Sequence, residues 1–384
     1  MSTGPHTREY VLDDTYSVRV FENFEGFLSL RETWDEVLRI HGTHEPFLCH
    51  EWFRIWLKHF LGDAELFITI LYRDSIPVLI APLIRKNELY KRILNVKKIE
   101  LIGNAHSPIK NFIFGDTDPL ARKKLLNYFF TSMATVLNDW DILELDYIPE
   151  ENDNYVLIGQ AIAENRMAHR DVTSFNDWLL EDINYSGSEY FNNRTKNCRK
   201  EIRRRTRRLE DEGLIEIDIT NEHYNYEQYM QTYLDVRTCS WKHPENGSSF
   251  LEDYRKYAKN RTWLRFSALL LDGKPLSCHM RIVCNNVAYL MESVYDINYK
   301  EFSPTTILRS RLMNYLIDEE KVTTVDTIRG DEEYKKEWTP TKRERKCITL
   351  FNKTIKGYFF SFISLKLLPI IRKTRGDTSI KPTM

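Results

Sequence analysis

The chain has 384 residues, of which 42% are hydrophobic and 29% are charged, and its formal net charge is -1. This length suits two domains, because a single hydrophobic core usually stops growing near about 250–300 residues. The charge balance of 55 Lys and Arg against 56 Asp and Glu argues against a protein that coats nucleic acid along its whole length. Contact with a polyanion would have to come from a local patch.

The cysteines and the N-terminus indicate a cytoplasmic setting. The six cysteines are scattered, without the C-x-x-C spacing of a redox motif or a zinc ribbon. Unpaired cysteines are typical of a reducing compartment. The first residues, MSTGPHTREYVLDD, lack the charged and apolar regions of a signal peptide, and no run of about 18 apolar residues predicts a membrane span. We therefore expect a cytoplasmic protein.

The first half predicts alternating strands and helices. In order, these are a strand at Tyr16–Phe21, helices at Phe27–Ile40 and Glu51–Phe60, strands at Glu65–Tyr72, Pro77–Ile84, Lys97–Ile102 and Asn111–Phe114, a helix at Leu120–Leu137 and a strand at Asp141–Tyr147. The helices are predicted from apolar residues at helical spacing, and the strands from β-rich runs. The aromatic residues of the first two helices are expected in the core. A four-residue connection, Arg73–Ile76, predicts a hairpin.

The second half repeats this order. It predicts strands at Leu214–Thr220, Trp263–Leu271, Pro275–Cys284, Val287–Tyr295 and Val322–Ile328, with helices at Tyr226–Thr238, Phe250–Ala258 and Thr305–Asp318. The Asp272-Gly273 pair is a strong hairpin signal. Self-similarity of this length indicates an internal duplication. The fold class is therefore expected to be α/β (α+β mixed), with two tandem domains that each hold a mostly antiparallel sheet flanked by helices.

Two segments outside this repeat suggest surface contacts. Arg194–Arg208 (RTKNCRKEIRRRTRR) carries nine Lys or Arg in fifteen residues and predicts one helix that ends before Gly213. It is either a phosphate-facing or RNA-facing surface, or a solvated helix whose arginine stems cover apolar surface. The tail Gly357–Arg375 would either make a weak contact with an anionic membrane surface or, as is more common, pack on its own domain. The first alternative would place the protein at the inner face of the membrane.

Several short motifs together resemble a known family. They are Ser240–Lys242, Leu271–Pro275, Tyr295–Asp296, Phe302–Pro304, Asp326–Lys335 (DTIRGDEEYK) with Trp338, and in the first half Trp52–Phe60 and Ile80–Leu83. Between roughly residues 17 and 350 the chain resembles the GNAT-type acyltransferases of the BioF2-like or cellulose-biosynthesis CelD-like group, to which the FemAB-type aminoacyltransferases are more distantly related.

The resemblance implies two GNAT-like domains, at residues 16–165 and 166–350. Residues 1–15 would be a flexible N-terminus and 351–384 an amphipathic tail. The second domain would bind an acyl-CoA, expected to be acetyl-CoA, as cosubstrate. It would transfer the acyl group to an amine or hydroxyl of a sugar or amino-sugar intermediate of polysaccharide or cell-envelope synthesis.

The resemblance also suggests binding residues. Those expected to bind the acyl donor are Ser303, Pro304, Thr305 and Thr306 at the start of a helix, whose unpaired N–H groups favour phosphate, together with Tyr334 and Lys335. Those expected to bind the acceptor are Trp241, Lys242, Tyr295 and Arg329. One departure is clear: Tyr299–Thr306 (YKEFSPTT) contains no glycine, and Thr305 stands where the relatives carry one. Glycine permits close backbone approach to phosphate, so its absence weakens the expectation of ordinary CoA binding.

Acyl transfer needs a base for the incoming amine or hydroxyl and donors for the oxyanion. The candidate catalytic residues are His279, Glu292 and Asp326. Histidine has a suitable intrinsic pKa, and a carboxyl among apolar residues would have a raised pKa if buried. Each residue also has a structural reading: a satisfied core histidine, a solvent-facing Glu292, and an ion pair between Asp326 and Arg329.

No metal site is expected. His41, His44 and His50, with Glu45 and Cys49, match no standard zinc spacing, and a turn between helices explains them better.

Two other functions remain open. One is an aminoacyl transfer from charged transfer RNA, suggested by the basic segment. The other is a non-catalytic binding or scaffold protein with a degenerate pocket, suggested by the missing glycine.

Overall fold

The computed structural model describes residues 7–42, 45–150, 153–242 and 248–368. They divide into two compact units. The first unit contains the chain up to Phe175 and again from Glu344, and the second contains Asn176–Arg343.

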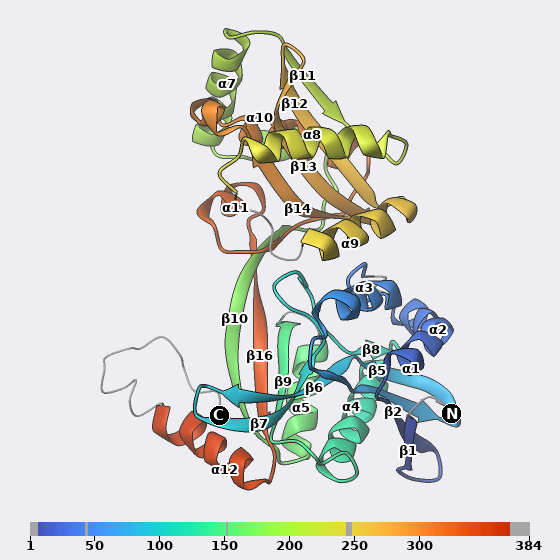
Figure 1. Cartoon of the computed structure of the whole chain (residues 1–384). Helices are drawn as coiled ribbons and strands as arrows, with labels where there is room; N and C mark the ends of the chain where they lie inside the picture. Colours follow the sequence, from blue (N-terminus) through green and yellow to red (C-terminus); the bar gives the residue numbers. More distant parts are fainter. Residues whose placement is uncertain (1–6, 43–44, 151–152, 243–247, 369–384) are drawn as a thin grey trace. The chain divides into compact units, whose positions relative to one another are not determined.

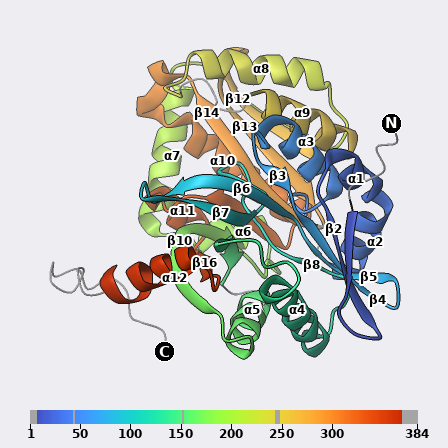
Figure 2. The same ribbon diagram turned by 60° about the horizontal axis from the view of Figure 1, so that its bottom comes forward.

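The first unit contains a five-stranded sheet, in the order β1-β2-β4-β5-β8, and a further group of paired strands that includes β6, β7 and β9. Its elements are β1 (Thr7–Val11), β2 (Tyr16–Phe21), α1 (Phe24–Ser29), α2 (Arg31–His41), α3 (His50–Phe60), β3 (Glu65–Leu66), β4 (Ile68–Arg73), β5 (Ile76–Ala81), β6 (Leu83–Tyr90), β7 (Leu94–Leu101), β8 (Ile113–Phe114), α4 (Pro119–Ala134), β9 (Ile142–Pro149), α5 (Asp153–Glu164), α12 (Ile355–Phe362) and a π-helical turn (Ile363–Leu367). β2, β4 and β5 pair antiparallel, β6 pairs antiparallel with β7, and β7 pairs parallel with β9. Helices α4 and α5 pack together, as Figure 2 shows.

The second unit begins with two helices and then follows a similar order of elements. It contains α6 (Gly187–Asn192), α7 (Lys196–Glu210), β11 (Ile215–Ile219), α8 (Tyr226–Thr238), α9 (Ser248–Asn260), β12 (Leu264–Leu271), β13 (Lys274–Cys284), β14 (Val287–Tyr295), a 3₁₀ helix (Ile297–Phe302), α10 (Pro304–Asp318), β15 (Thr324–Arg329) and α11 (Glu333–Trp338). β11 to β14 form an antiparallel meander, and β14 pairs parallel with β15. Helix α8 crosses one face of this sheet and α10 packs on the other (Figure 1).

Two long strands carry the chain between the units. β10 (Ala168–Leu180) begins in the first unit, and its residues from Asp177 onward pair with β15. β16 (Thr341–Phe351) begins in the second unit, and its residues from Arg345 onward pair with β9. Each parallel pair is therefore flanked by a strand that enters from the other half of the chain.

The predicted mixed α/β fold is confirmed, and so is the repeated order of elements. In each unit a strand, helices, a hairpin and a further strand lead through a helix to a last strand that pairs parallel. The parallel registers correspond closely: Lys98, Ile99 and Glu100 pair with Ile142–Glu144, and Val287, Ala288 and Tyr289 pair with Thr324–Asp326. Of the aromatic residues expected in the core, Trp34, Trp52 and Trp56 are buried, whereas Phe60 is partly exposed.

Several details differ from the sequence expectations. The single helix predicted at Phe27–Ile40 is two helices, because the Asn23 side chain caps α1 and the chain breaks helical geometry at Leu30. The predicted four-residue hairpin connection is a two-residue turn, Asp74–Ser75, since Arg73 pairs with Ile76. Both turn residues have positive φ, 49° and 66°, which suits the right-handed twist of a tight hairpin.

The two ends of the chain were expected to be a flexible segment and an amphipathic tail. Thr7–Val11, within the segment expected to be flexible, forms β1 and pairs antiparallel with β2. At the other end, Phe360 of α12 is buried against Tyr90, so this part of the tail packs on its own unit. The basic end of the predicted tail lies outside the described residues. No helix in the described ranges has the length and apolar character that a membrane crossing needs.

Candidate active site

The parallel strands β14 and β15 separate after a short paired stretch. Their register covers Val287–Tyr289 and Thr324–Asp326, whereas β14 continues to Tyr295 and β15 to Arg329. Within these two fully described strands, residues 290–295 have no partner in β15. The backbone N–H and C=O groups that face the opening are therefore available to an extended ligand.

A bulge in β14 lies inside this unpaired part. β13 and β14 change register between the pairs Met280–Glu292 and Arg281–Leu290, so that β14 carries an extra residue at Met291. A bulge bends its strand and redirects the neighbouring side chains. Glu292, one of the expected catalytic residues, comes directly after it.

The start of α10 is the second part of the site. Ser303 caps the helix in the left-handed conformation, with φ 49°, and its side chain makes no capping hydrogen bond. Pro304 occupies the first turn, where its missing N–H costs nothing. The Thr305 N–H has no hydrogen-bond partner among the described residues, whereas the Thr306 N–H donates to the Ser303 carbonyl at 2.9 Å. The segment Tyr299–Thr306 contains no glycine, and Ser303 adopts the positive φ at this turn.

Glu292 is surrounded by cationic side chains from α8, α9 and the loop between them. Its carboxylate accepts a hydrogen bond from the Tyr233 hydroxyl at 2.6 Å, and it forms ion pairs with Arg237, with Lys242 at 3.2 Å and with Arg255 at 3.6 Å. The Glu292 side chain is 13% exposed. It therefore neither lies among apolar residues nor faces open solvent, which were the two sequence readings. Three cations around one carboxylate make this cluster positive overall.

His279 lies on the opposite face of the sheet. Residues that pair across adjacent strands share a face, and Glu292 pairs with Met280 whereas His279 pairs with Ser293. His279 is 2% exposed, and its Nε2 lies 3.4 Å from the Thr305 carbonyl at the start of α10. Burial lowers the pKa of His279 well below its usual value, and the positive charge of Arg309 lowers it further. A neutral, buried imidazole here supports the helix start, and it does not share a proton with Glu292.

Asp326 belongs to a third group, at the β15 side. One carboxylate oxygen accepts from the Ile328 N–H at 2.6 Å, and the other forms an ion pair with Arg343. Arg343 also lies 3.5 Å from Asp177 of β10. The ion pair that the sequence suggested for Asp326 was with Arg329, whereas the structure places Arg343 beside it. These contacts tie β15 to its neighbours.

The remaining predicted binding residues are divided between exposed and buried positions. Trp241 is 60% exposed, and Tyr334 is half exposed with the Arg309 guanidinium over its ring at 4.7 Å. Lys335 is buried, and its ammonium group donates to the Arg329 carbonyl at 2.8 Å and pairs with Glu332 at 3.0 Å. Tyr295 ends β14 at the unpaired part of the strand. Lys335 is thus tied to the loop after β15.

In the first unit, His50 has a packing role. His50 stacks on Phe27 with ring centroids 4.2 Å apart, and its Nε2 lies 3.0 Å from the Phe27 carbonyl. Burial lowers the pKa of His50. His44 lies outside the described residues. In the described ranges no group of three or more His, Cys, Asp or Glu could hold a metal ion.

Of the residues that surround Glu292, Lys242 was among the predicted binding residues, whereas sequence reasoning missed Tyr233, Arg237 and Arg255. Tyr233 and Arg237 are four residues apart on α8, so they share one helix face, and Arg255 on α9 lies with its guanidinium 5.3 Å from the Tyr233 ring. The spacing of Tyr233 and Arg237 could have indicated from the sequence that α8 has a polar face. The spacing could not indicate that this face lies against Glu292, because that depends on how α8 packs on β13 and β14.

Comparison with known protein families gives one match, which covers most of the second unit. The acetyltransferase (GNAT) domain family matches residues 196–336, which include α7 and every element from β11 to β15. No curated protein matches the sequence.

Among solved structures, the chain is similar to FemX, with a TM-score of 0.50 and 12% identity over 77% of this chain and 90% of that one. It also matches L-PGS from Bacillus licheniformis, with a TM-score of 0.47 and 12% identity over 83% of this chain and 96% of that one. A tandem GNAT protein from the clavulanic acid biosynthesis pathway matches with a TM-score of 0.45 and 9% identity, over 88% of this chain and 99% of that one. At these identities the FemX likeness is a likeness of fold. Residues 196–336 match the GNAT acetyltransferase domain family, and this match indicates that the protein is a transferase.

Proposed function

We propose that the protein is an acyl-CoA-dependent N- or O-acyltransferase that acts on a sugar or amino-sugar intermediate of polysaccharide or cell-envelope synthesis. The observation that carries this proposal is the separation of β14 from β15 beside the uncapped start of α10. Within the GNAT-related proteins we place it in the BioF2-like or CelD-like group, on the motifs quoted above.

The acyl donor would lie along the unpaired part of β14. The amides of a pantetheine arm can pair with strand groups that have lost their neighbour, as a peptide does when it adds to a sheet edge. The pyrophosphate would meet the first turn of α10, where the Thr305 N–H and the Thr305 and Thr306 hydroxyls are at hand. Ser303 and Pro304 set the direction of this turn. Tyr334 and Lys335 belong to α11, and the Tyr334 ring lies against Arg309 of α10.

The acceptor would approach on the face of the sheet that α8 and α9 cover. Glu292 is the candidate that takes the proton from the acceptor amine or hydroxyl as its nitrogen or oxygen bonds to the thioester carbonyl carbon. The C–S bond then breaks, and the CoA thiolate leaves and is protonated by water or by the Tyr334 hydroxyl. Lys242 and Arg237 would stabilise the oxyanion or an acidic group of the acceptor, with Trp241, Tyr295 and Arg329 as further acceptor contacts.

His279 and Asp326 have supporting roles in this proposal. His279 holds the carbonyl of Thr305, and so the direction of the first turn of α10. Asp326 holds the backbone of β15 through the Ile328 N–H. Both residues are placed to keep the two sides of the donor opening in position.

Titration calorimetry of the full chain with acetyl-CoA and with longer acyl-CoAs tests the donor. We expect one site per chain and saturable binding in the micromolar to millimolar range. Binding of free CoA should be weaker or equal, because the acyl group adds contacts. Absence of binding by every acyl-CoA at millimolar concentration would overturn the donor assignment. Binding without any transfer to a panel of acceptors would favour the scaffold alternative.

A second candidate keeps the chemistry and changes the donor to aminoacylated transfer RNA. The basic helix α7 favours it, because a row of cations is the ordinary surface for a phosphate backbone. In the same experiment, charged transfer RNA would bind with a steep dependence on salt, and acyl-CoA would not bind.

A further inference from the structure

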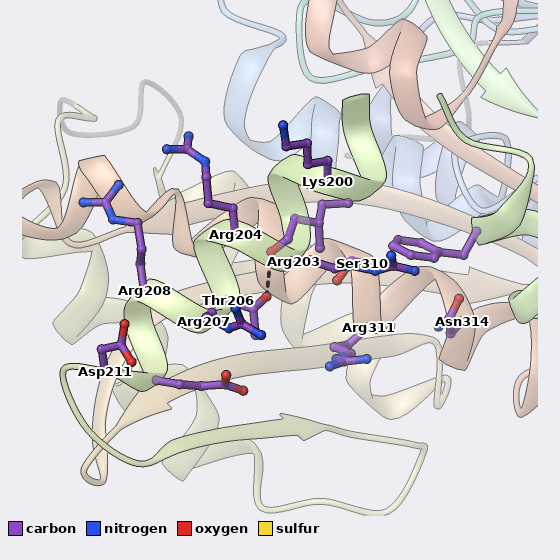
Figure 3. Close-up of a pocket in the computed structure, with 13 residues that line it drawn as sticks. Lys200, Arg203, Arg204, Thr206, Arg207, Arg208, Asp211, Ser310, Arg311 and Asn314 are labelled. Atoms are coloured by element: carbon purple, nitrogen blue, oxygen red, sulfur yellow. Dashed lines mark hydrogen bonds between the residues drawn. The ribbon is translucent and has the colours of Figure 1, made fainter. Parts of the chain in front are cut away.

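A groove of about 700 Å³ lies between α7 and α10, and it is lined mainly by basic and polar side chains. Figure 3 shows Arg203, Arg207 and Arg311 gathered around the space between the two helices, with Arg204 and Arg208 directed away from it. Lys200, Arg203 and Arg207 follow each other at i, i+3 and i+7, so they form one face of α7. Because a helix rises about 1.5 Å per residue, this row of charge is roughly 10 Å long.

The cations at the centre of the groove are not neutralised by the protein. Within the described part of the chain, Lys200, Arg203, Arg207 and Arg311 make no side-chain hydrogen bond or ion pair. By contrast, Arg204 and Arg205 on the neighbouring face of α7 both pair with Glu201, and Arg208 pairs with Glu301. Arg203 and Arg207 are like charges at i, i+4 on α7, a spacing at which like charges destabilise a helix. The acids that line the groove, Glu210 and Asp211, lie at the C-terminal end of α7.

The other wall of the groove offers groups of a different kind. Asn314 on α10 has a buried Oδ1 atom without a hydrogen-bond partner, and Phe191 lines the same groove. A buried acceptor without a partner is costly unless a ligand or water supplies the donor. An aromatic ring and an amide acceptor suit a nucleobase with its amino group, whereas the row of guanidinium groups suits phosphates.

The groove is separate from the proposed donor site. Ser310, Arg311 and Asn314 line the face of α10 that packs on α7. Other residues of α10 lie at the proposed donor site: the Thr305 carbonyl contacts His279, and Arg309 lies against Tyr334.

We propose that the groove between α7 and α10 binds a nucleotide with two or more phosphate groups. The phosphates would lie against Arg203, Arg207 and Arg311, and the base would lie toward Phe191 and Asn314. A volume of about 700 Å³ falls in the ordinary range of small-molecule pockets. A flat membrane surface fits this concave site less well, and the two large apolar residues that line it, Phe191 and Ile202, are not among the exposed hydrophobic residues.

Calorimetry with ATP, ADP, pyrophosphate and adenosine, at low ionic strength, tests the proposal. ATP and ADP are expected to bind at one site per chain, and adenosine should not bind. Arg203→Gln, Arg207→Gln and Arg311→Gln should each weaken ADP binding about tenfold, because each removes a charge-assisted hydrogen bond to phosphate. Asn314→Ala should weaken ADP binding and leave pyrophosphate binding unchanged.

Arg205→Gln is the matched control, because it removes the same charge from the same helix at a residue that pairs with Glu201 and does not line the groove. ADP binding should also persist when acetyl-CoA is saturating, which separates this site from the donor site whether or not the proposed function holds. The proposal is overturned if neither ATP nor ADP binds saturably at millimolar concentration, if Arg205→Gln is as harmful as Arg207→Gln, or if acetyl-CoA displaces ADP. Binding of an RNA oligonucleotide or of anionic vesicles without nucleotide binding would also overturn it.

Discussion

Glu292→Gln is expected to lower kcat for acyl transfer by about 10²–10⁴-fold, the ordinary contribution of a positioned general base. The substitution keeps the shape of the side chain and an acceptor for the Tyr233 hydroxyl, but it removes the group that takes the proton. It also leaves Arg237, Lys242 and Arg255 without their shared anion. The measurement is acyl-CoA turnover with any acceptor that supports activity, together with thermal unfolding of the same sample.

Glu216→Gln is the matched control for this variant. Glu216 is exposed on β11, and its side chain makes no hydrogen bond or ion pair with the described residues. Its replacement should leave both turnover and thermal unfolding unchanged. A Glu292→Gln protein that is folded and turns over at the wild-type rate would remove Glu292 from the mechanism. The effect on kcat, and not on acyl-CoA affinity, distinguishes a base from a donor-binding residue.

Glu320→Leu is expected to lower the free energy of unfolding by about 3–5 kcal/mol, because breaking a buried ion pair leaves an uncompensated charge. Glu320 lies 3.4 Å from both Arg265 and Arg281. Arg281 is completely buried and donates to the Phe266 and Thr220 carbonyls at 2.9 and 2.8 Å. Burial lowers the pKa of Arg281 to about 10, because the charged form loses its hydration there. Urea denaturation of the wild-type protein and of Glu320→Leu measures the difference in the free energy of unfolding.

Glu319→Leu is the control, since Glu319 is the exposed neighbour of Glu320. Its effect should stay within about 0.5 kcal/mol, as for most surface substitutions. A double variant, Arg281→Met with Glu320→Leu, should recover part of the loss because both charges are gone. Equal stability of Glu320→Leu and Glu319→Leu would show that the ion pair contributes nothing to the unit.

The elements that pair locally were predictable from the sequence. Tyr226–Thr238 and Val287–Tyr295 were expected at their observed limits, and β12 and β13 at nearly theirs. Each of these segments carries its own signal, either apolar residues at helical spacing or an Asp-Gly turn between β-rich runs. These signals depend only on residues close together in the sequence, so they can be recognised without knowing the tertiary structure.

β10 and β16 were missed because their partners are distant in the sequence. Thr341–Phe351 begins with TKRERK, which looks like a charged loop, and it becomes a strand only because its residues from Arg345 pair with β9. In the same way, the end of β10 pairs with β15. Local propensity cannot predict a strand whose backbone is satisfied by residues about 150–200 positions away.

The candidate site was predictable in part. Glu292 was proposed because a carboxyl among apolar residues would have a raised pKa if buried. The cations around it come from α8, α9 and the loop between them, and the packing of α8 on β13 and β14 helps to bring them together. His279 and Glu292 were proposed for the same task. The pairing of β13 with β14 shows that they occupy opposite faces, and this follows from a register that includes a bulge.

Hydrogen–deuterium exchange of the full chain, with and without acetyl-CoA, tests the central claim most directly. The account predicts that acetyl-CoA slows exchange in residues 290–295 of β14, in the end of β15 and in the first turn of α10, and leaves β7 and β9 unchanged. Protection confined to other segments, or no change at saturating acetyl-CoA, would contradict a donor site between the separating strands.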